Sequence, residues 1–111
     1  MEKIKVRKPV VAGQFYPASL EDLNGQIESF VDLNVEKKDV VACILPHAGY
    51  IYSGEVAAKT VSGINIKDKV ILLGPNHTGQ GARFSLMSEG IWKTPLGQVK
   101  IDSNFSNGVT E

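Results

Sequence analysis

Two apolar runs, each followed by a loop with glycine and proline, set the strongest constraint on how this chain folds. Residues 40–45 (VVACIL) and 69–74 (KVILLG) show no polar alternation, which is the pattern of strands buried on both faces. Between them, apolar residues recur at helical spacing from about Ser53 and end at Gly63. The order strand, helix, strand indicates a βαβ unit with parallel strands. We therefore predict an α/β fold whose mixed, largely parallel sheet is flanked by helices, in a single partial domain over residues 1–111.

The other predicted elements are shorter. Ser19 is placed to cap a helix that buries an apolar stripe and ends at about Leu33. Residues 4–11 predict an interrupted edge strand, and residues 83–88 and 96–101 predict two short strands around a turn. The segment that starts at Asp102 has the pattern of a helix cap with no helix behind it.

The charge balance and the cysteine content exclude several classes of protein. Twelve basic residues balance twelve acidic ones, so the chain has no net field to hold nucleic acid or an anionic membrane. Its apolar runs are far shorter than the ~20 residues that span a bilayer, and its first residues lack the pattern of a signal peptide. The single cysteine, Cys43, cannot form an internal disulfide. We expect a cytoplasmic protein that binds neither nucleic acid nor membrane.

The two histidines of the chain follow the two predicted buried strands. His47 lies two residues past residue 45, and His77 lies three residues past residue 74. Parallel strands end at the same edge of a sheet about 5 Å apart, so both imidazoles are predicted to converge on one metal ion. The alternative is that both are ordinary polar loop residues. Two imidazoles also fall short of the three protein ligands that a catalytic metal usually has. A carboxylate or a thiolate as the third ligand would suit iron, copper or zinc.

No residue of the chain is an evident third ligand. Cys43 lies along the predicted strand, about 13 Å from its exit, and is better interpreted as a buried core thiol. Glu55 lies in the first turn of the second helix, where an acidic side chain usually stabilises the helix dipole. Glu89 and Asp102 belong to later elements whose positions the sequence does not determine.

Four aromatic residues lie in predicted loops. Tyr50 and Tyr52 follow His47, while Phe15 and Tyr16 stand in the first loop. A tyrosine beside a metal can donate a hydrogen bond to substrate or act as an acid. The competing interpretation is a ring packed on the sheet with its hydroxyl in water.

Four motifs together resemble one known family: residues 7–17 (RKPVVAGQFYP), 46–54 (PHAGYIYSG), 73–77 (LGPNH) and 92–97 (WKTPLG). They are similar to motifs of the MEMO family, whose prokaryotic members are also called AmmeMemoRadiSam system protein B. Proteins of that family resemble class III extradiol dioxygenases of the LigB type in fold. The resemblance implies an α/β sheet with a metal site at its edge, and a radical SAM partner system.

The resemblance also assigns roles to individual residues. It implies metal-site and catalytic positions for His47 and His77, and a catalytic position for Tyr52 in the same pocket. Phe15 and Tyr16 correspond to an aromatic pair near the pocket mouth that a eukaryotic relative links to phosphotyrosine-peptide binding, and we expect Tyr50 to join them in ligand binding. Family members are well over twice this length, and their third metal ligand, a cysteine, lies in a C-terminal half. We therefore expect these 111 residues to be an N-terminal fragment.

Two functions follow from the resemblance. The first is a metal-dependent redox protein related to extradiol dioxygenases, using Fe(II), copper or zinc when full length. The alternative is a non-catalytic module that binds a peptide or small ligand in the same pocket. For the 111-residue chain itself we expect neither catalysis nor tight metal binding, and a homodimer that unites four histidines would be the exception.

Overall fold

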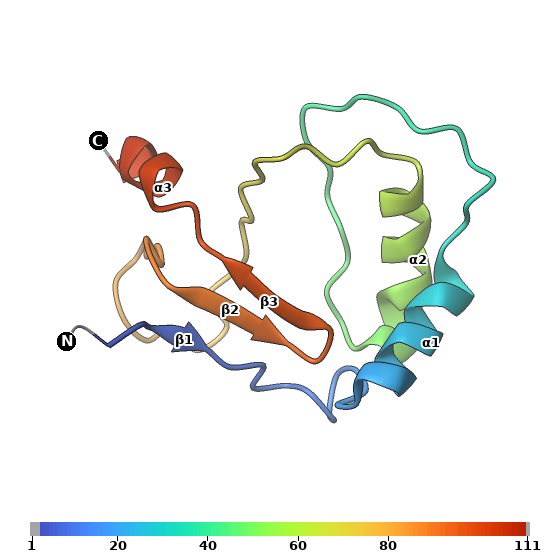
Figure 1. The fold of residues 1–111 in the computed structure, drawn as a ribbon, viewed down its shortest axis with the longest axis horizontal. Coiled ribbons are helices and arrows are strands. Elements are labelled where there is room, and N and C mark those ends of the chain that lie inside the picture. The colour runs from blue at the N-terminus through green and yellow to red at the C-terminus, as the bar shows by residue number, and fades with distance from the viewer. Residues whose placement is uncertain (1–2, 111) are drawn as a thin grey trace. The chain divides into compact units, whose positions relative to one another are not determined.

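The computed structural model describes residues 3–110, which divide into two compact units. Residues 10–70 form the helical unit, and residues 3–9 with 71–110 form the sheet unit. Helices and a mixed sheet confirm the α/β fold class, whereas the single-domain interpretation stays a prediction (Figure 1). The elements in chain order are β1 (Val6–Arg7), α1 (Leu20–Phe30), α2 (Tyr50–Ser62), β2 (Ile91–Thr94), β3 (Gly97–Lys100) and α3 (Ser103–Thr110).

Helix α1 begins where its cap predicts. The Asp22 N–H donates to the Ser19 hydroxyl oxygen at 3.1 Å, which satisfies one of the backbone donors that a helix start leaves open. Leu23, on the inner face, is only 3 % exposed. The helix ends at Phe30, three residues before the predicted end at Leu33, because Val31 already has extended backbone.

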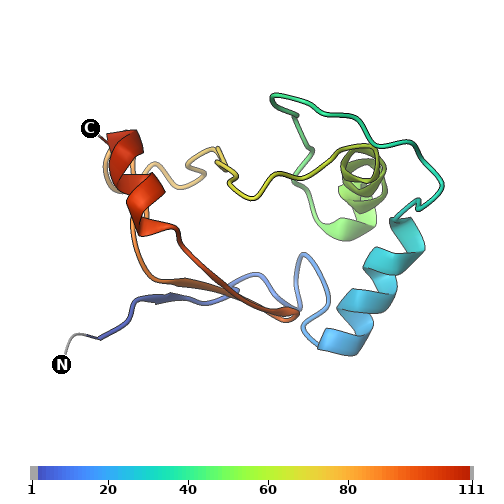
Figure 2. The same cartoon turned by 45° about the horizontal axis from the view of Figure 1, so that its top comes forward.

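Helices α1 and α2 pack against each other with crossed axes: in Figure 2, α2 is seen almost end-on while α1 lies along the page. Gly54 of α2 is buried at this contact. A Cβ placed on it would lie 2.9 Å from Cε2 of Phe30, so only a residue without a side chain allows this approach. This contact adds to the core of the helical unit, where Leu23 and Ile64 are buried.

The sheet unit contains a three-stranded sheet in the order β1-β2-β3. β1 pairs with β2 in parallel, and β2 forms an antiparallel hairpin with β3. The β2–β3 ladder is the longer of the two. The Arg7 guanidinium lies 4.9 Å from the centre of the Trp92 ring, a cation–π contact that links β1 to β2. The Ile91 N–H donates to the Lys5 carbonyl at 2.9 Å.

Gly90 determines where β2 starts. Its φ of +113° favours glycine, and a Cβ here would collide with the Lys5 carbonyl oxygen. The chain therefore turns at this residue and pairs with β1 only from Ile91 onward. The prediction of a strand over residues 83–88 is wrong, whereas that over 96–101 is confirmed by β3.

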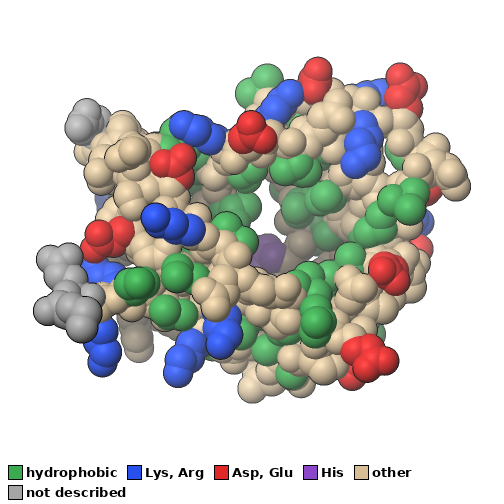
Figure 3. Space-filling view, viewed as in Figure 1, with side chains coloured by type: hydrophobic (Ala, Val, Ile, Leu, Met, Phe, Trp, Pro, Cys, Tyr) green, Lys and Arg blue, Asp and Glu red, His purple; other side chains and the backbone are tan. Residues whose placement is uncertain are grey.

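The two apolar runs that dominate the sequence are not strands. Residues 40–45 and 69–74 belong to no ladder within the described chain, and their side chains are exposed, with Ile44 at 96 % and Leu73 at 93 %. The prediction of two buried strands is therefore wrong here, because an apolar run forms a strand only where neighbouring strands supply hydrogen bonds. Figure 3 shows green hydrophobic side chains distributed over the visible surface. Beside the first run, one isolated parallel bridge joins Lys38 to Ile64.

Helix α3 corrects another expectation. Asp102 caps it as its position suggests, since its Oδ1 accepts from the Phe105 N–H at 3.0 Å, but a helix of eight residues follows the cap. Within residues 3–110, none of the helices combines the length and the apolar character needed to cross a membrane.

Two glycine-to-alanine changes test the helix contact. Gly54→Ala is expected to lower the free energy of unfolding by about 1 kcal/mol, because overpacking against Phe30 outweighs the gain in helix propensity. Gly25→Ala, inside α1 with nothing within 4 Å of the added Cβ, should raise it by up to about 1 kcal/mol. Urea unfolding followed by far-ultraviolet circular dichroism measures both free energies. Tryptophan fluorescence is not suitable, because Trp92 lies in the sheet unit and both glycines lie in the helical unit. Equal stabilisation by both changes would contradict the packing.

Candidate functional site

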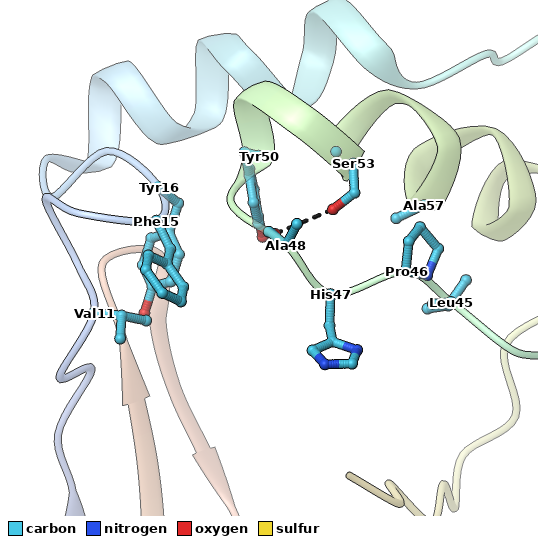
Figure 4. A pocket seen from close by; sticks show the side chains of 11 residues that line it. Val11, Phe15, Tyr16, Leu45, Pro46, His47, Ala48, Tyr50, Ser53 and Ala57 are labelled. Atoms are coloured by element: carbon cyan, nitrogen blue, oxygen red, sulfur yellow. Dashed lines mark hydrogen bonds between the residues drawn. The ribbon is translucent and has the colours of Figure 1, made fainter. Parts of the chain in front are cut away.

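The helical unit contains a pocket of about 340 Å³ where the predicted ligand-binding residues meet. Figure 4 shows Val11, Phe15 and Tyr16 on one side of it, Leu45, Pro46 and Ala57 on the other, and the remaining side chains between them. The lining residues are Val11, Phe15, Tyr16, Leu45, Pro46, His47, Ala48, Tyr50, Ser53, Gly54 and Ala57.

A tight loop presents the first two aromatic rings. The Val11 carbonyl accepts hydrogen bonds from the N–H groups of Gln14 and Phe15, and the Gly13 N–H donates to the Tyr16 carbonyl at 2.7 Å. Gly13 has a φ of +84°, which a residue with a side chain rarely adopts. These backbone bonds hold Phe15 and Tyr16 in one closed turn.

The same loop supports the start of α2. Gly49, the residue before the helix, has no side chain to act as a cap. The Tyr50 N–H instead donates to the Phe15 carbonyl at 2.7 Å, and a Cβ on Gly49 would lie 3.4 Å from the same oxygen. The helix therefore starts at Tyr50, three residues before the predicted start at Ser53.

The early start decides which tyrosine faces the pocket. Positions i, i+3, i+4 and i+7 share one face of a helix, and here these are Tyr50, Ser53, Gly54 and Ala57. Tyr52 lies off this face, is 84 % exposed and is not among the described residues that line the pocket. Its catalytic role stays a prediction. Ser53, Gly54 and Ala57 were not predicted from the sequence to line a pocket, although this spacing, counted from Tyr50, places them on its face.

His47 lines the pocket just before α2. In Figure 4 its imidazole ring points away from the helix, and next to it the Ser53 hydroxyl donates to the Ala48 carbonyl at 3.1 Å. His77 belongs to the sheet unit, in a loop where the Asn76 side chain accepts from Thr78 and Gly79. The convergence of the two imidazoles on one metal ion stays a prediction.

The candidate third ligands have other roles. Glu55 pairs with Lys59 at 3.2 Å along α2, and Glu89 pairs with Lys5 at 3.7 Å. Asp102 caps α3. Cys43 is exposed, so the interpretation as a buried core thiol is wrong, because residues 40–45 are not covered by a sheet or helix. Within residues 3–110, no group of three or more His, Cys, Asp or Glu side chains is placed to hold a metal ion.

The rings of Tyr16 and Tyr50 form the aromatic centre of the pocket. Their centroids lie 5.5 Å apart with planes tilted by 44°, within the range of favourable ring pairs. Burial raises the pKa of the Tyr50 hydroxyl above its usual 10.0, and the neighbouring Tyr16 raises it further. Tyr50 therefore holds its proton firmly and presents a hydrogen-bond donor.

The structure thus defines an α/β protein in which one histidine and three aromatic side chains surround a pocket. Residues 7–111 match the model of the family described as Memo-like protein. A MEMO1 family protein of Methanosarcina acetivorans is 43 % identical over 106 residues, covering 95 % of this chain, and one of Aquifex aeolicus is 46 % identical over 103 residues, covering 92 %. One of Aeropyrum pernix is 42 % identical over 122 residues, covering 97 %. The chain belongs to the Memo-like family.

The chain spans about two fifths of the length of these curated relatives. The matched region covers 39 % of the Methanosarcina acetivorans and Aquifex aeolicus proteins and 43 % of the Aeropyrum pernix protein.

The raised pKa of Tyr50 predicts how stability depends on pH. A folded-state pKa above the unfolded value stabilises the fold fully below pH 10.0, and this stabilisation is lost as the pH rises through the folded pKa. The difference in tyrosinate absorbance between the wild type and Tyr50→Phe should show a titration above 10.0. In Tyr16→Phe the shift should shrink but persist, since burial is the larger cause. Titration of Tyr50 at or below 10.0 would contradict the upward shift that burial of its hydroxyl predicts.

Proposed function

We propose that residues 10–70 bind an aromatic group of a small molecule or peptide in the pocket at the start of α2. The observation that carries this proposal is the meeting of Phe15, Tyr16 and Tyr50 around one pocket of about 340 Å³. Ligand sites commonly measure about 300–1,000 Å³, are largely apolar and have a few fixed polar groups. A pocket at the lower end of this range suits a single ring with a short substituent.

The lining chemistry supports the same ligand. Aromatic faces attract the edges of another ring, with centroids 4.5–7 Å apart in favourable pairs. The Tyr50 hydroxyl is protonated at neutral pH, and burial raises its pKa further, so it is a donor for an oxygen on the ligand. His47 adds an imidazole that can donate or accept.

A metal-dependent redox activity related to that of class III extradiol dioxygenases is the second candidate, favoured by the position of His47 in this pocket. When bound, Fe(II) or copper would supply open positions for oxygen and substrate, and zinc would supply a Lewis acid. The described residues alone do not fit such a metal: catalytic sites use three protein ligands, and residues 3–110 offer no such group. In this candidate His47 and His77 have the metal-site roles that the family resemblance implies for them.

The proposal has two further parts, a location and a partner. A cytoplasmic location agrees with the single cysteine, Cys43. A radical SAM system as partner is proposed from the resemblance alone.

Two tyrosines on the same helix provide a matched test of the pocket. Tyr50→Ala is expected to weaken binding of the probe 4-ethylphenol about tenfold, because the ligand loses a ring contact and a donor. Tyr52→Ala, which removes a ring outside the pocket, should leave the affinity within about twofold. Isothermal titration calorimetry measures both. Weaker binding only in Tyr52→Ala would place the ligand on the other face of α2.

Metal analysis tests the second candidate. The 111-residue chain should retain no stoichiometric iron, copper or zinc after gel filtration, since two imidazoles are too few ligands. The full-length Methanosarcina acetivorans relative should retain metal, consume oxygen with catechols, and lose both properties when the histidine that aligns with His47 is replaced by alanine. Sub-micromolar, stoichiometric binding by the monomeric 111-residue chain would contradict the first expectation. A metal-free relative that still binds 4-ethylphenol would contradict the redox candidate.

A further inference from the structure

A second pocket, of about 240 Å³, shares the aromatic residues of the first. Phe15, Tyr16 and Tyr50 line both pockets, and Gln26 of α1 lines only the second. Both pockets belong to the helical unit. The two pockets therefore adjoin at these three rings.

Gln26 occupies a position where an apolar residue is expected. It lies three residues after the buried Leu23 and four before Phe30, on the face of α1 that packs inward. Its Oε1 is buried and has no hydrogen-bond partner among the described residues. A buried acceptor without a donor is costly, so such an atom calls for an explanation. The terminal amide turns about a broad χ3 torsion, which allows the oxygen to reach a group in the pocket without backbone movement.

The surroundings of Gln26 indicate which donor fits. None of the described residues that line the second pocket is charged, so no lysine or arginine of the pocket competes for the oxygen. The faces of Phe15, Tyr16 and Tyr50 attract a cation through their ring quadrupoles. An amide oxygen beside aromatic faces suits a protonated amine, which carries both positive charge and N–H donors.

We propose that the second pocket binds the ammonium group of a ligand whose aromatic ring occupies the first pocket, with Gln26 Oε1 accepting a hydrogen bond from it. This inference rests on the proposed function, because it assumes that a ring binds beside Phe15 and Tyr50. It specifies the substrate class further: an aromatic amine, either free or as part of a peptide.

The test compares three probes that share one ring. Tyramine carries an ammonium group, 4-ethylphenol has no nitrogen, and N-acetyltyramine has an uncharged amide N–H. At neutral pH the chain should bind tyramine roughly tenfold more tightly than 4-ethylphenol, as for a hydrogen bond to a charged group. N-acetyltyramine should show little of this gain. An equal gain from N-acetyltyramine would overturn the assignment to a cation.

Substitution of Gln26 tests whether this residue causes the tighter binding of tyramine. Gln26→Leu should abolish the preference for tyramine and leave binding of 4-ethylphenol unchanged. Its urea midpoint should be equal or higher, because it removes a buried acceptor, so loss of the preference cannot be ascribed to unfolding. Gln98→Leu, the same change on the exposed strand β3, should keep the full preference.

The results separate the two proposals. If 4-ethylphenol binds but tyramine binds no better, or if Gln26→Leu keeps the preference, the ammonium site is wrong and the aromatic pocket stands. If none of the three probes binds, the proposed function fails, and this inference fails with it.

Discussion

The hydrogen bond from the Tyr50 N–H to the Phe15 carbonyl is the interaction on which the candidate site depends. It joins a closed loop to the first turn of α2 at 2.7 Å and satisfies a backbone donor that Gly49 has no side chain to cap. The absence of a side chain on Gly49 also lets the loop approach this closely. Because the bond fixes Phe15 relative to Tyr50, aromatic residues far apart in the sequence line one pocket.

The sequence predicted helices α1 and α2 from local signals, whereas it predicted a cap with no helix behind it where α3 forms. Ser19 and Asp102 accept the hydrogen bonds that their positions suggest, and Gly63 ends α2. The start of α2 was missed because its cap is the Phe15 carbonyl, a group distant in sequence. Because α2 starts three residues earlier than predicted, both tyrosines belong to the helix. Tyr50 faces the pocket, and Tyr52 does not.

Strands were predicted less well, because they depend on partners that a local pattern does not specify. Residues 40–45 have the composition of a buried strand and still lie exposed, whereas the short β1 forms because it pairs with β2. The site shows the same division. His47 was identified from its spacing, and Phe15, Tyr16 and Tyr50 from the family resemblance. The structure brings all four to one pocket. Gln26 was missed because a lone glutamine has no motif, and only burial without a partner reveals it.

One face of α2 both packs the helical unit and lines its pocket, which couples stability to binding. Gly54 contacts Phe30 of α1, while Tyr50, one turn earlier, lies beside Tyr16. A side chain added at Gly54 would approach not only the Phe30 ring but also Tyr50 Cβ, at 3.2 Å. Any movement of α2 that relieves such a contact also moves the Tyr50 ring against its partner. The close approach of the two helices is therefore a condition for the geometry of the pocket as well as for the stability of the unit.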